Sequence, residues 1–511
     1  MWILDELRSM RESDRPAIIY RGKTITFKEL WTFSEAVAFF HKKKLKTKAP
    51  IIIYGNKDIE ITIAMVAALK SGRPYICVDT TFPKERVNKI AKITNAELMY
   101  NFSNIHFDEN EGFFDEHTEI KTRKDFSEII SRYKYETIKE DCWVKNSDIC
   151  YILFTSGSTG EPKGVNITKY NLLNFIEAFK EFFDINGQGV ALNQVSYSFD
   201  ISGIQFYYYL ASGNTLFNID SAMIENTSEL FHYLGISSIN SWVSTPSFME
   251  MCAVYDEFNF NLLPNLSKIV LAGEVLTKKL VNKLNKKFPN AKIINGYGPS
   301  EITILTSACE ITTKMLNDPD NLPIGRVIKE ATYWIEEQGN SLIGNEGELI
   351  VVSDSVCKGY YKQPELTKAC FFDYDGKRGY RTKDIVYKKG DMLYFKGRTD
   401  FQIKLNGYRI ELEDIENNIN KIDIVYKSVV VPIYQDEKIS YIHAFISLID
   451  CIAKGSLETK IYIKGELKKK IPNYMVPRKI TIIDKLPINN NGKIDRKKII
   501  EKYIDKERTN G

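Results

Sequence analysis

Two stretches of this chain alternate short β-branched runs with helical runs, and this alternation limits the fold more than any other feature. In the first stretch, residues 51–54, 75–78 and 97–100 are expected strands, and residues 59–69 and 83–93 are expected helices. The second stretch has expected strands at 189–195, 241–244, 268–272 and 292–295, with helices between them. Strands that alternate with helices at this spacing predict mainly parallel, layered α/β sheets.

The sequence pattern changes after Pro323. Short expected strands at 331–336, 348–352 and 392–396 are separated by Gly and Asp turns, which is typical of a small, mostly antiparallel β unit. A chain of 511 residues also exceeds one ordinary core, so we expect at least two domains. We predict a large N-terminal domain, residues 1–399, made of two layered α/β sheets and a small β-barrel-like subdomain. A small, mobile α+β domain is expected at residues 400–511.

Composition narrows the compartment and the partners. The chain has 70 Lys and Arg residues against 66 Asp and Glu residues, and the net charge of +4 indicates neither nucleic acid nor an acidic membrane surface. Acids interrupt the apolar N-terminal residues, unlike a signal peptide, and no apolar run approaches the length of a membrane span. The eight cysteines are scattered, without a C-x-x-C pair, as buried thiols are in a reducing compartment. We therefore expect a cytoplasmic protein without membrane insertion.

Residues 151–165, YILFTSGSTGEPKGV, pass from an apolar run into a segment of Thr, Ser, Gly, Pro and one Lys. A strand that feeds such a loop can hold a polyphosphate with backbone and side-chain donors. The spacing differs from a Walker A loop, because Gly164 follows the lysine and Glu161-Pro162 precede it. A plain connecting loop is the alternative. The candidate phosphate-binding residues are Thr155, Ser156, Gly157, Ser158, Thr159, Gly160 and Lys163.

Residues 295–301, NGYGPSE, follow a predicted strand at the end where open α/β sheets bind ligands. Its two glycines and proline form a tight loop that can present the Tyr297 ring to a nucleotide base, and ordinary packing of Tyr297 is the alternative. Glu301 can offer a carboxylate to a hard cation such as magnesium. Asp384 follows a basic stretch and can accept both ribose hydroxyls, although a turn aspartate would read the same way.

Two further segments suggest movement and a single exposed cation. Residues 397–409, GRTDFQIKLNGYR, mix polar groups and glycines between the two expected domains, as a hinge requires. Residues 486–495 form a turn-rich run that projects Lys493. The five histidines lie away from all these segments, so Ser-His-Asp chemistry and histidine zinc sites are poor interpretations. The remaining interpretation is a site for ATP and magnesium, in which catalysis depends on positioning and charge stabilisation.

These segments, in this order, resemble the superfamily of adenylate-forming enzymes, which includes acyl- and aryl-CoA ligases, luciferases and the adenylation domains of nonribosomal peptide synthetases. The resemblance covers nearly the whole chain. It is strongest to the amino-acid adenylating members, in particular the D-alanine:D-alanyl carrier protein ligases. The residues that carry it are FDIS at 199–202, STPSF at 244–248, GEVL at 273–276 and FQIKLNGYRIE at 401–411.

The resemblance implies two half-reactions, in which a carboxylate attacks the α-phosphate of ATP and a thiol then takes the acyl group as a thioester. Residues 155–164 would hold the β- and γ-phosphates, with Thr155 and Lys163 catalytic. Tyr297 would stack on adenine near Asn295, and Glu301 would bind Mg²⁺. Asp384 and Arg398 would hold the ribose, Asp400 would be the hinge, and Lys493 would bridge the substrate carboxylate and the α-phosphate. The resemblance also places Gly273, Glu274, Gly296, Gly298 and Ser300 at the nucleotide.

Asp200 sets the expected substrate class. A carboxylate in an acyl pocket is costly to bury unless it meets a cation, and an amino acid brings an α-ammonium. A helix N-cap is the alternative role for Asp200. The remaining pocket residues implied by the family pattern are all apolar, so a charged substrate side chain is not expected. They are Ile201, Ile204, Val243, Val270, Ala272, Gly296, Ile304 and Leu305.

The sequence departs from the D-alanine ligases at four positions. Those ligases have a cysteine where Ala272 stands and a bulkier residue than Gly296, and both changes should enlarge the pocket. Ser300 replaces a threonine, and Lys383 replaces the usual glycine before Asp384. A larger aliphatic or aromatic amino acid is therefore possible, and the identity and chirality of the substrate stay open.

The first functional hypothesis is an amino-acid adenylating ligase that loads the phosphopantetheine thiol of a separate carrier protein. Because few residues follow Lys493, we expect the carrier to act in trans. The alternatives are an acyl- or aryl-CoA ligase, which Asp200 disfavours, and a nucleotide-binding protein without turnover. The joint presence of Lys163, Glu301, Asp384 and Lys493 disfavours the latter.

Overall fold

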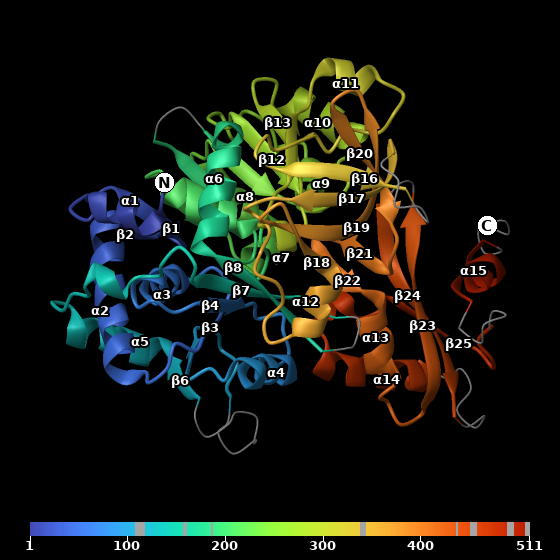
Figure 1. The fold of residues 1–511 in the computed structure, drawn as a ribbon, viewed down its shortest axis with the longest axis horizontal. Coiled ribbons are helices and arrows are strands. Elements are labelled where there is room, and N and C mark those ends of the chain that lie inside the picture. The colour runs from blue at the N-terminus through green and yellow to red at the C-terminus, as the bar shows by residue number, and fades with distance from the viewer. Residues whose placement is uncertain are drawn as a thin grey trace. The chain divides into compact units, whose positions relative to one another are not determined.

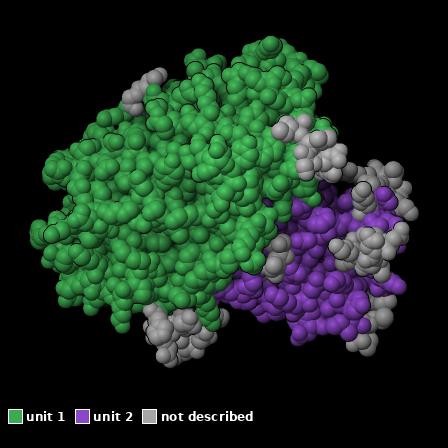
Figure 2. Space-filling model, in the orientation of Figure 1, with its two compact units in different colours: residues 1–80, 91–154, 164–399 green, residues 81–90, 155–163, 400–511 purple. Residues whose placement is uncertain are grey.

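The computed structural model describes residues 1–107, 118–155, 157, 161–184, 188–337, 344–435, 438–449, 457–487 and 495–505. Its contacts divide the chain into two compact units, coloured separately in Figure 2. Unit 1 comprises Met1–Thr80, Ala91–Phe154 and Gly164–Thr399, and unit 2 comprises Thr81–Ile90, Thr155–Lys163 and Asp400–Gly511. No helix in the described part of the chain is long and apolar enough to cross a membrane.

One α/β sheet contains the first alternating stretch (Figure 1). Its described strands have the order β6-β5-β3-β4-β7-β8, and the pairs from β6 to β7 are parallel. The bounds are β3 Ile51–Tyr54, β4 Tyr75–Val78, β5 Leu98–Asn101, β6 Glu119–Thr122, β7 Ile149–Thr155 and β8 Lys163–Thr168. Eleven of the twelve residues of α3 (Ile59–Lys70) are buried, as an all-round apolar helix must be.

A second, larger sheet contains the second alternating stretch. Its described strands run β15-β14-β13-β12-β11-β9-β10-β1-β2, with parallel pairs in the middle and antiparallel pairs at both edges. The bounds are β1 Pro16–Tyr20, β2 Lys23–Thr26, β9 Val190–Asn193, β10 Thr215–Asn218, β11 Ser241–Ser244, β12 Lys268–Ala272, β13 Lys292–Tyr297, β14 Ser307–Glu310 and β15 Arg326–Val327. The expected strands of both stretches are thus confirmed, with ends shifted by a few residues.

Amphipathic helices cover these sheets in unit 1. In α10, three apolar residues are buried while several lysines face solvent, and Thr277 caps its first turn. Thr168 and Asn171 form a reciprocal capping box at the start of α6. The bounds are α1 Ile3–Ser9, α2 Phe27–Lys44, α5 Arg123–Tyr133, α6 Lys169–Phe183, α7 Ser221–Glu225, α8 Thr227–Ile236, α9 Pro246–Ala253, α10 Lys278–Lys287, α11 Thr313–Asn317 and α12 Pro364–Cys370. Helix α4, Lys84–Thr94, spans the division between the units.

One helical segment of unit 1 departs from α geometry. Residues Ile204–Leu210, labelled η3, form a fully buried π-helix. Its Tyr207 hydroxyl lies 2.9 Å from the Tyr75 hydroxyl of the first sheet, and its Tyr209 hydroxyl accepts a hydrogen bond from Ser241 of the second sheet. The π-helix therefore connects the two sheets. Its first residue, Ile204, is one of the predicted acyl-pocket residues.

The predicted antiparallel β unit is a third sheet in unit 1. Its order is β16-β17-β19-β18, with β20 also paired to β19, and the pairings of the described strands do not close it into a barrel. The bounds are β16 Thr332–Glu336, β17 Glu346–Val352, β18 Phe371–Tyr374, β19 Lys377–Lys389 and β20 Met392–Arg398. The long β19 bears Asp384.

Unit 2 has its own apolar core, around Ile410, Ile415, Val430, Ala444 and Leu467. Two described sheets build it, one of β21 and β22 and one ordered β23-β24-β25. The bounds are β21 Gln402–Leu405, β22 Tyr408–Glu411, α13 Leu412–Ile419, β23 Val425–Gln435, β24 Lys438–Leu448, α14 Leu457–Lys470, β25 Lys479–Ile482 and α15 Arg496–Ile500. A buried ion pair joins two of its separate segments, since Arg86 Nη1 lies 3.3 Å from Asp414 Oδ2.

Candidate active site

The loop after β13 is shaped by close backbone contacts in unit 1. A Cβ at Gly298 would lie 2.6 Å from the Ile304 carbonyl oxygen and 2.6 Å from the Leu305 Cα, so only glycine fits there. A short 3₁₀ turn, η4 (Ser300–Ile302), follows, and Thr303 and Ile304 then have positive φ angles of 53° and 74°. A positive φ is unusual for a β-branched residue such as Ile304, and such strain is common at functional sites.

Asp384 lies at the centre of a polar cluster formed by β13, β19 and β20. The Tyr297 hydroxyl donates to Asp384 Oδ2 at 2.5 Å, and Arg398 Nη1 donates to Oδ1 of the same carboxylate. The register of β19 and β20 places Asp384 directly opposite Arg398. Burial, and then the charge of Asp384, raise the pKa of the Tyr297 phenol well above its ordinary value. The structure therefore brings together the three residues predicted for adenine and ribose.

Glu301 is fully buried and held from two sides. Its Oε1 accepts a hydrogen bond of 2.8 Å from the Tyr360 hydroxyl, and its carbonyl oxygen accepts one from the Cys357 N–H. Within the described residues, no group of three or more His, Cys, Asp or Glu side chains could hold a metal ion. A single hard carboxylate still fits Mg²⁺, which proteins often bind through one or two carboxylates together with substrate phosphates.

Asp200 stands at the entrance to the segment that leads into the π-helix. Its Oδ1 accepts the Ile201 N–H at 2.8 Å, and its Oδ2 accepts the Ser300 hydroxyl at 2.5 Å. Both carboxylate oxygens are thereby oriented, one from within its own segment and one from η4. The bond from Ile201 comes from the next residue in the chain, whereas an N-cap side chain accepts from the second or third residue of the helix, so this contact is not an N-cap bond.

The predicted apolar pocket residues are all buried. None of the isoleucines, valines or Leu305 is more than 6% exposed. A Cβ added at Gly296 would lie 3.0 Å from both methyl carbons of Leu305 and 3.4 Å from the Ala272 Cβ. Leu305 therefore fills the space that a bulkier residue at 296 would take. The enlargement expected from Gly296 is offset by this neighbouring side chain, because side chains in an interior pack without leaving voids.

The phosphate loop is described in part. Thr155 ends β7 with a buried hydroxyl that has no hydrogen-bond partner among the described residues, and Lys163 Nζ lies 3.6 Å from Glu411 Oε1. At Gly157, a Cβ would lie 2.2 Å from the Glu161 carbonyl oxygen. The predicted residues Ser156, Ser158, Thr159 and Gly160 lie outside the described residues, as does Lys493.

Three of the remaining predicted residues, Asn295, Glu274 and Asp400, form hydrogen bonds within the protein. The Asn295 amide donates to the Pro323 carbonyl at 2.8 Å, and Glu274 Oε2 accepts the Ser247 N–H at 3.0 Å in the first turn of α9. Gly273 has a φ of 91°. Asp400 Oδ1 accepts the Gln402 N–H at 3.3 Å.

Sequence reasoning missed Tyr360 and the meaning of Lys383. Tyr360 follows Gly359 in the run KGYYK, and a Gly-Tyr pair after a strand was the signal that could have drawn attention to it. Lys383 has a φ of 60°, in the left-handed region that favours glycine. This angle explains why the resembling family has glycine at this position.

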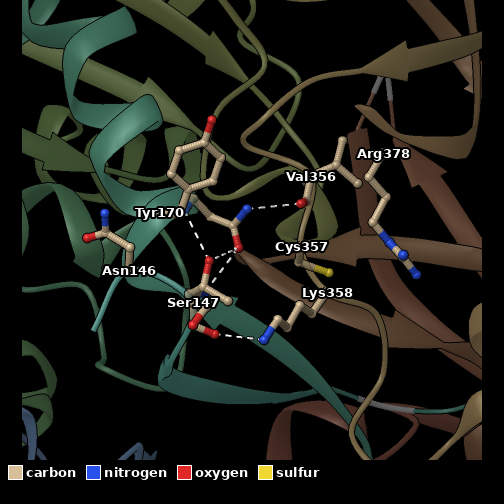
Figure 3. Close-up of a pocket in the computed structure, with 9 residues that line it drawn as sticks. Asn146, Ser147, Tyr170, Val356, Cys357, Lys358 and Arg378 are labelled. Carbon is tan, nitrogen blue, oxygen red and sulfur yellow. Dashed lines mark hydrogen bonds between the residues drawn. The ribbon is translucent and has the colours of Figure 1, made fainter. Parts of the chain in front are cut away.

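A cavity of about 280 Å³ lies elsewhere in unit 1, between the start of α6 and the segment after β17 (Figure 3). Several of its polar groups form hydrogen bonds within the protein. Lys358 Nζ donates to the Ser147 carbonyl, the Asn171 amide donates to the Val356 carbonyl, and the Tyr170 N–H donates to the Asn146 carbonyl. This cavity contains none of the predicted site residues.

Comparison with known proteins gives a consistent result. A family model described as AMP-binding enzyme matches residues 6–361, and one described as AMP-binding enzyme C-terminal domain matches residues 414–493. A D-alanine--D-alanyl carrier protein ligase of Bacillus licheniformis is 37% identical over 501 residues, covering 96% of this chain and 97% of the relative. One from Bacillus cereus is 35% identical over 505 residues, covering 98% and 99%.

Solved structures share the fold at lower identity. The Vibrio cholerae adenylation domain AlmE in complex with glycyl-adenosine-5'-phosphate has a TM-score of 0.79 at 22% identity, with 98% of each chain covered. An NRPS protein containing adenylation and PCP domains has a TM-score of 0.81 at 21% identity, covering 98% of this chain and 84% of the other.

Proposed function

We propose that this chain activates an apolar amino acid and loads it onto a carrier protein. The chain belongs to the AMP-binding enzyme family and is an AMP-forming ligase that uses ATP, and the proposal starts from this fact. The observation that carries the proposal is the carboxylate of Asp200 beside a pocket of buried apolar side chains. A carboxylate in such a place is stabilised by a cationic ligand, and the α-ammonium of an amino acid supplies one.

The substrate side chain is small. Leu305 occupies the space beside Gly296, and the pocket residues from β11, β12 and η3 are fully buried. An amino acid with a short apolar side chain therefore fits better than a large aliphatic or aromatic one, with about 1 to 3 kcal/mol for each methylene. The names of the Bacillus relatives, D-alanine--D-alanyl carrier protein ligases, agree with a small substrate.

The nucleotide side of the site consists of Tyr297 for adenine, with Asn295 near its amino group, and Asp384 with Arg398 for ribose. Gly273, Glu274, Gly296, Gly298 and the loop 155–164 complete the assignment, and Lys163 neutralises phosphate charge. Glu301 would hold Mg²⁺, which when bound would offset charge on the phosphates. Tyr360 keeps the Glu301 carboxylate oriented toward that task.

The second half-reaction needs an acceptor thiol, and we assign it to the phosphopantetheine arm of a carrier protein in trans. Residues 1–399 form the adenylating domain and residues 400–511 a mobile domain that turns about Asp400. In this assignment Lys493 bridges the substrate carboxylate and the α-phosphate in the first half-reaction. The reaction takes place in the cytoplasm.

ATP–pyrophosphate exchange tests the proposal. The purified chain is assayed with every L- and D-amino acid and with simple carboxylic acids of matched size, each with ATP and Mg²⁺. We expect exchange with one or a few small apolar amino acids. Propionate against alanine is the sharpest matched pair, because the two differ only in the amine.

Exchange that is equal with propionate and alanine would contradict the role of Asp200 and would favour an acyl-CoA ligase. Maximal exchange with a large aromatic amino acid would contradict the small pocket. Transfer is checked separately, by following a radiolabelled amino acid onto a holo carrier protein and onto its apo form, which lacks the thiol.

A further inference from the structure

The cavity beside the start of α6 is separate from the residues assigned to ATP and to the amino acid (Figure 3). Its lining includes exposed residues, such as Tyr170 and Lys358, and fully buried ones, such as Cys357, so it leads from solvent toward the interior. Its volume of about 280 Å³ is just below the range of about 300 to 1,000 Å³ that is usual for pockets of drug-sized ligands. The cavity therefore suits a small ligand.

The lining of this cavity is positively charged. The nine described residues that line it include two cations, Lys358 and Arg378, and no Asp or Glu. Two acids that flank the lining segments in sequence have partners of their own. Asp148 Oδ2 accepts a backbone N–H at 2.7 Å, and Asp354 Oδ2 lies 3.5 Å from Lys377 Nζ. An anion in the cavity meets two cations and no like charge on the lining, so the cavity favours an anion.

Arg378 has unused hydrogen-bond donors. Its neighbour Arg381, three residues further along β19, pairs with Glu336 at 2.6 Å, whereas Arg378 forms no ion pair within the described part of the chain. The Arg378 Cζ lies 5.2 Å from the centroid of the Phe371 ring, and its Nε is buried without a hydrogen-bond partner among the described residues. A buried donor without a partner costs free energy. A planar guanidinium can bind a carboxylate through two parallel hydrogen bonds, which supplies the missing partner.

The rest of the lining narrows the class of carboxylate. The Lys358 ammonium has three protons and donates one of them to the Ser147 carbonyl at 2.7 Å, which leaves two for a ligand. Val356 and Cys357 add buried apolar surface, which suits a short hydrocarbon group. An amino acid would also bring an ammonium, and no acid of the lining can receive it. The cavity therefore favours a carboxylate without an amine, the opposite of the preference expected at Asp200.

The cavity also shares a chain segment with Glu301. Cys357 lines the cavity, and its N–H donates to the Glu301 carbonyl at 2.8 Å. Three residues later, the Tyr360 hydroxyl donates to Glu301 Oε1 at 2.8 Å. On the α6 side, the Asn171 amide donates to the Val356 carbonyl at 3.0 Å. A ligand that displaces residues 356–360 would therefore displace groups that orient Glu301.

We propose that this cavity binds a small organic carboxylate without an amine, and that the bound carboxylate acts on Glu301 through residues 356–360. Arg378 and Lys358 bind the carboxylate, and Val356 and Cys357 contact its hydrocarbon group. The effect on Glu301 rests on the proposed function, because it takes Glu301 as the magnesium carboxylate. The binding itself does not rest on that function.

Binding is tested by ligand-observed NMR titration of the purified full chain with propionate. The amino acid that gives the highest exchange rate is kept at saturation, so that the site at Asp200 is filled. We expect a Kd for propionate of about 0.1 to 10 mM, as befits so small a ligand. Arg378→Met, which keeps the length of the side chain, should raise this Kd roughly 10- to 100-fold, the range for a hydrogen bond to a charged group.

Arg381→Met is the matched control, because it removes a guanidinium from the same strand at an exposed position with its own carboxylate partner. Its Kd for propionate should equal that of the wild type. If Arg378→Met does not fold, Lys358→Met serves, since Lys358 is exposed and should give a smaller rise in the same Kd. A Kd that is unchanged in Arg378→Met, or in Lys358→Met where that variant is used, would overturn the site. Tighter binding of inorganic phosphate than of propionate would overturn the carboxylate assignment.

The effect on Glu301 is tested by the Mg²⁺ concentration for half-maximal pyrophosphate exchange, with and without saturating propionate. We expect propionate to change this concentration about fivefold or more in the wild type and to leave it unchanged in Arg378→Met. Equal Mg²⁺ concentrations with and without bound propionate would overturn the link to Glu301. The lack of any amino-acid-dependent exchange would overturn the proposed function, while Arg378-dependent binding of propionate would still support the site.

Discussion

Asp384 and Asp200 are two carboxylates of unit 1 that both accept short hydrogen bonds, but from different kinds of donor. Asp384 receives a guanidinium from Arg398 and a phenol from Tyr297, whereas the hydrogen bonds to Asp200 described above come from a backbone N–H and the Ser300 hydroxyl. A guanidinium offsets the charge of its partner, while a hydroxyl orients a carboxylate without offsetting its charge. Asp384 is accordingly suited to neutral ligand hydroxyls, and Asp200 to a cationic group.

The largest effect should come from breaking the ion pair of Asp384. In Arg398→Met, the carboxylate stays buried, since the two side chains are only 11% and 5% exposed. We expect a loss of about 3 to 5 kcal/mol in the free energy of unfolding, together with a higher KM for ATP. Thermal and urea unfolding measure the first quantity. The control is Arg326→Met, whose exposed pair with Asp391 should contribute less than about 1 kcal/mol.

At Asp200 we expect the opposite pattern, with a large effect on binding and a small one on stability. Asp200→Asn keeps the acceptor for the Ile201 N–H and removes the charge. Because Asp200 is half-buried, we expect the KM for the amino acid to rise about 100-fold, below the full value for a buried pair. Steady-state exchange kinetics at saturating ATP measure it. An unchanged value would mean that the substrate amine lies elsewhere.

A third, smaller effect concerns Glu301. Tyr360→Phe removes the hydroxyl that donates to its Oε1 and leaves the ring. We expect the Mg²⁺ concentration for half-maximal exchange to rise about tenfold, since this bond reaches a charged group, while the amino-acid KM stays constant. Tyr374→Phe, at the exposed end of strand β18, is the control. A shift in the amino-acid KM alone would contradict the assignment.

The smallest effect should come from Lys383, next to Asp384. Lys383→Gly relieves a φ of 60°, and we expect the free energy of unfolding to rise by up to about 1 kcal/mol with an unchanged KM for ATP. Lys388→Gly, in extended conformation on the same strand β19, should instead lower stability by about 0.5 to 1 kcal/mol. Thermal unfolding of the two variants should therefore shift in opposite directions.

The sequence predicted the alternating sheets well, because runs such as residues 51–54 and 268–272 carry their own strand pattern and are buried on both faces. It also predicted that Tyr297, Asp384 and Arg398 belong together, through resemblance. It could not predict the partners of single side chains. Tyr360 and Ser300 are far in sequence from the carboxylates that they contact, and such contacts depend on three-dimensional packing.

The effect of Gly296 on pocket size shows the same limit. In the sequence alone, a glycine in place of a bulkier residue predicts an enlarged pocket. In three dimensions the adjacent Leu305 lies 3.0 Å from the position of the missing Cβ. Volume is a property of several side chains together, and no single position in the sequence reports it.

Because residues Ile204–Leu210 form a π-helix, the number of residues in this segment helps to determine substrate specificity. Each π turn closes over one more residue than an α turn. Deletion of one residue would return the segment to α geometry and rotate Ile204 by about 100° relative to Tyr209. A pocket graft from an α-helical relative could then copy every lining residue and still present the wrong face. Any exchange of specificity between this enzyme and a relative should therefore transfer the whole segment with its residue count intact.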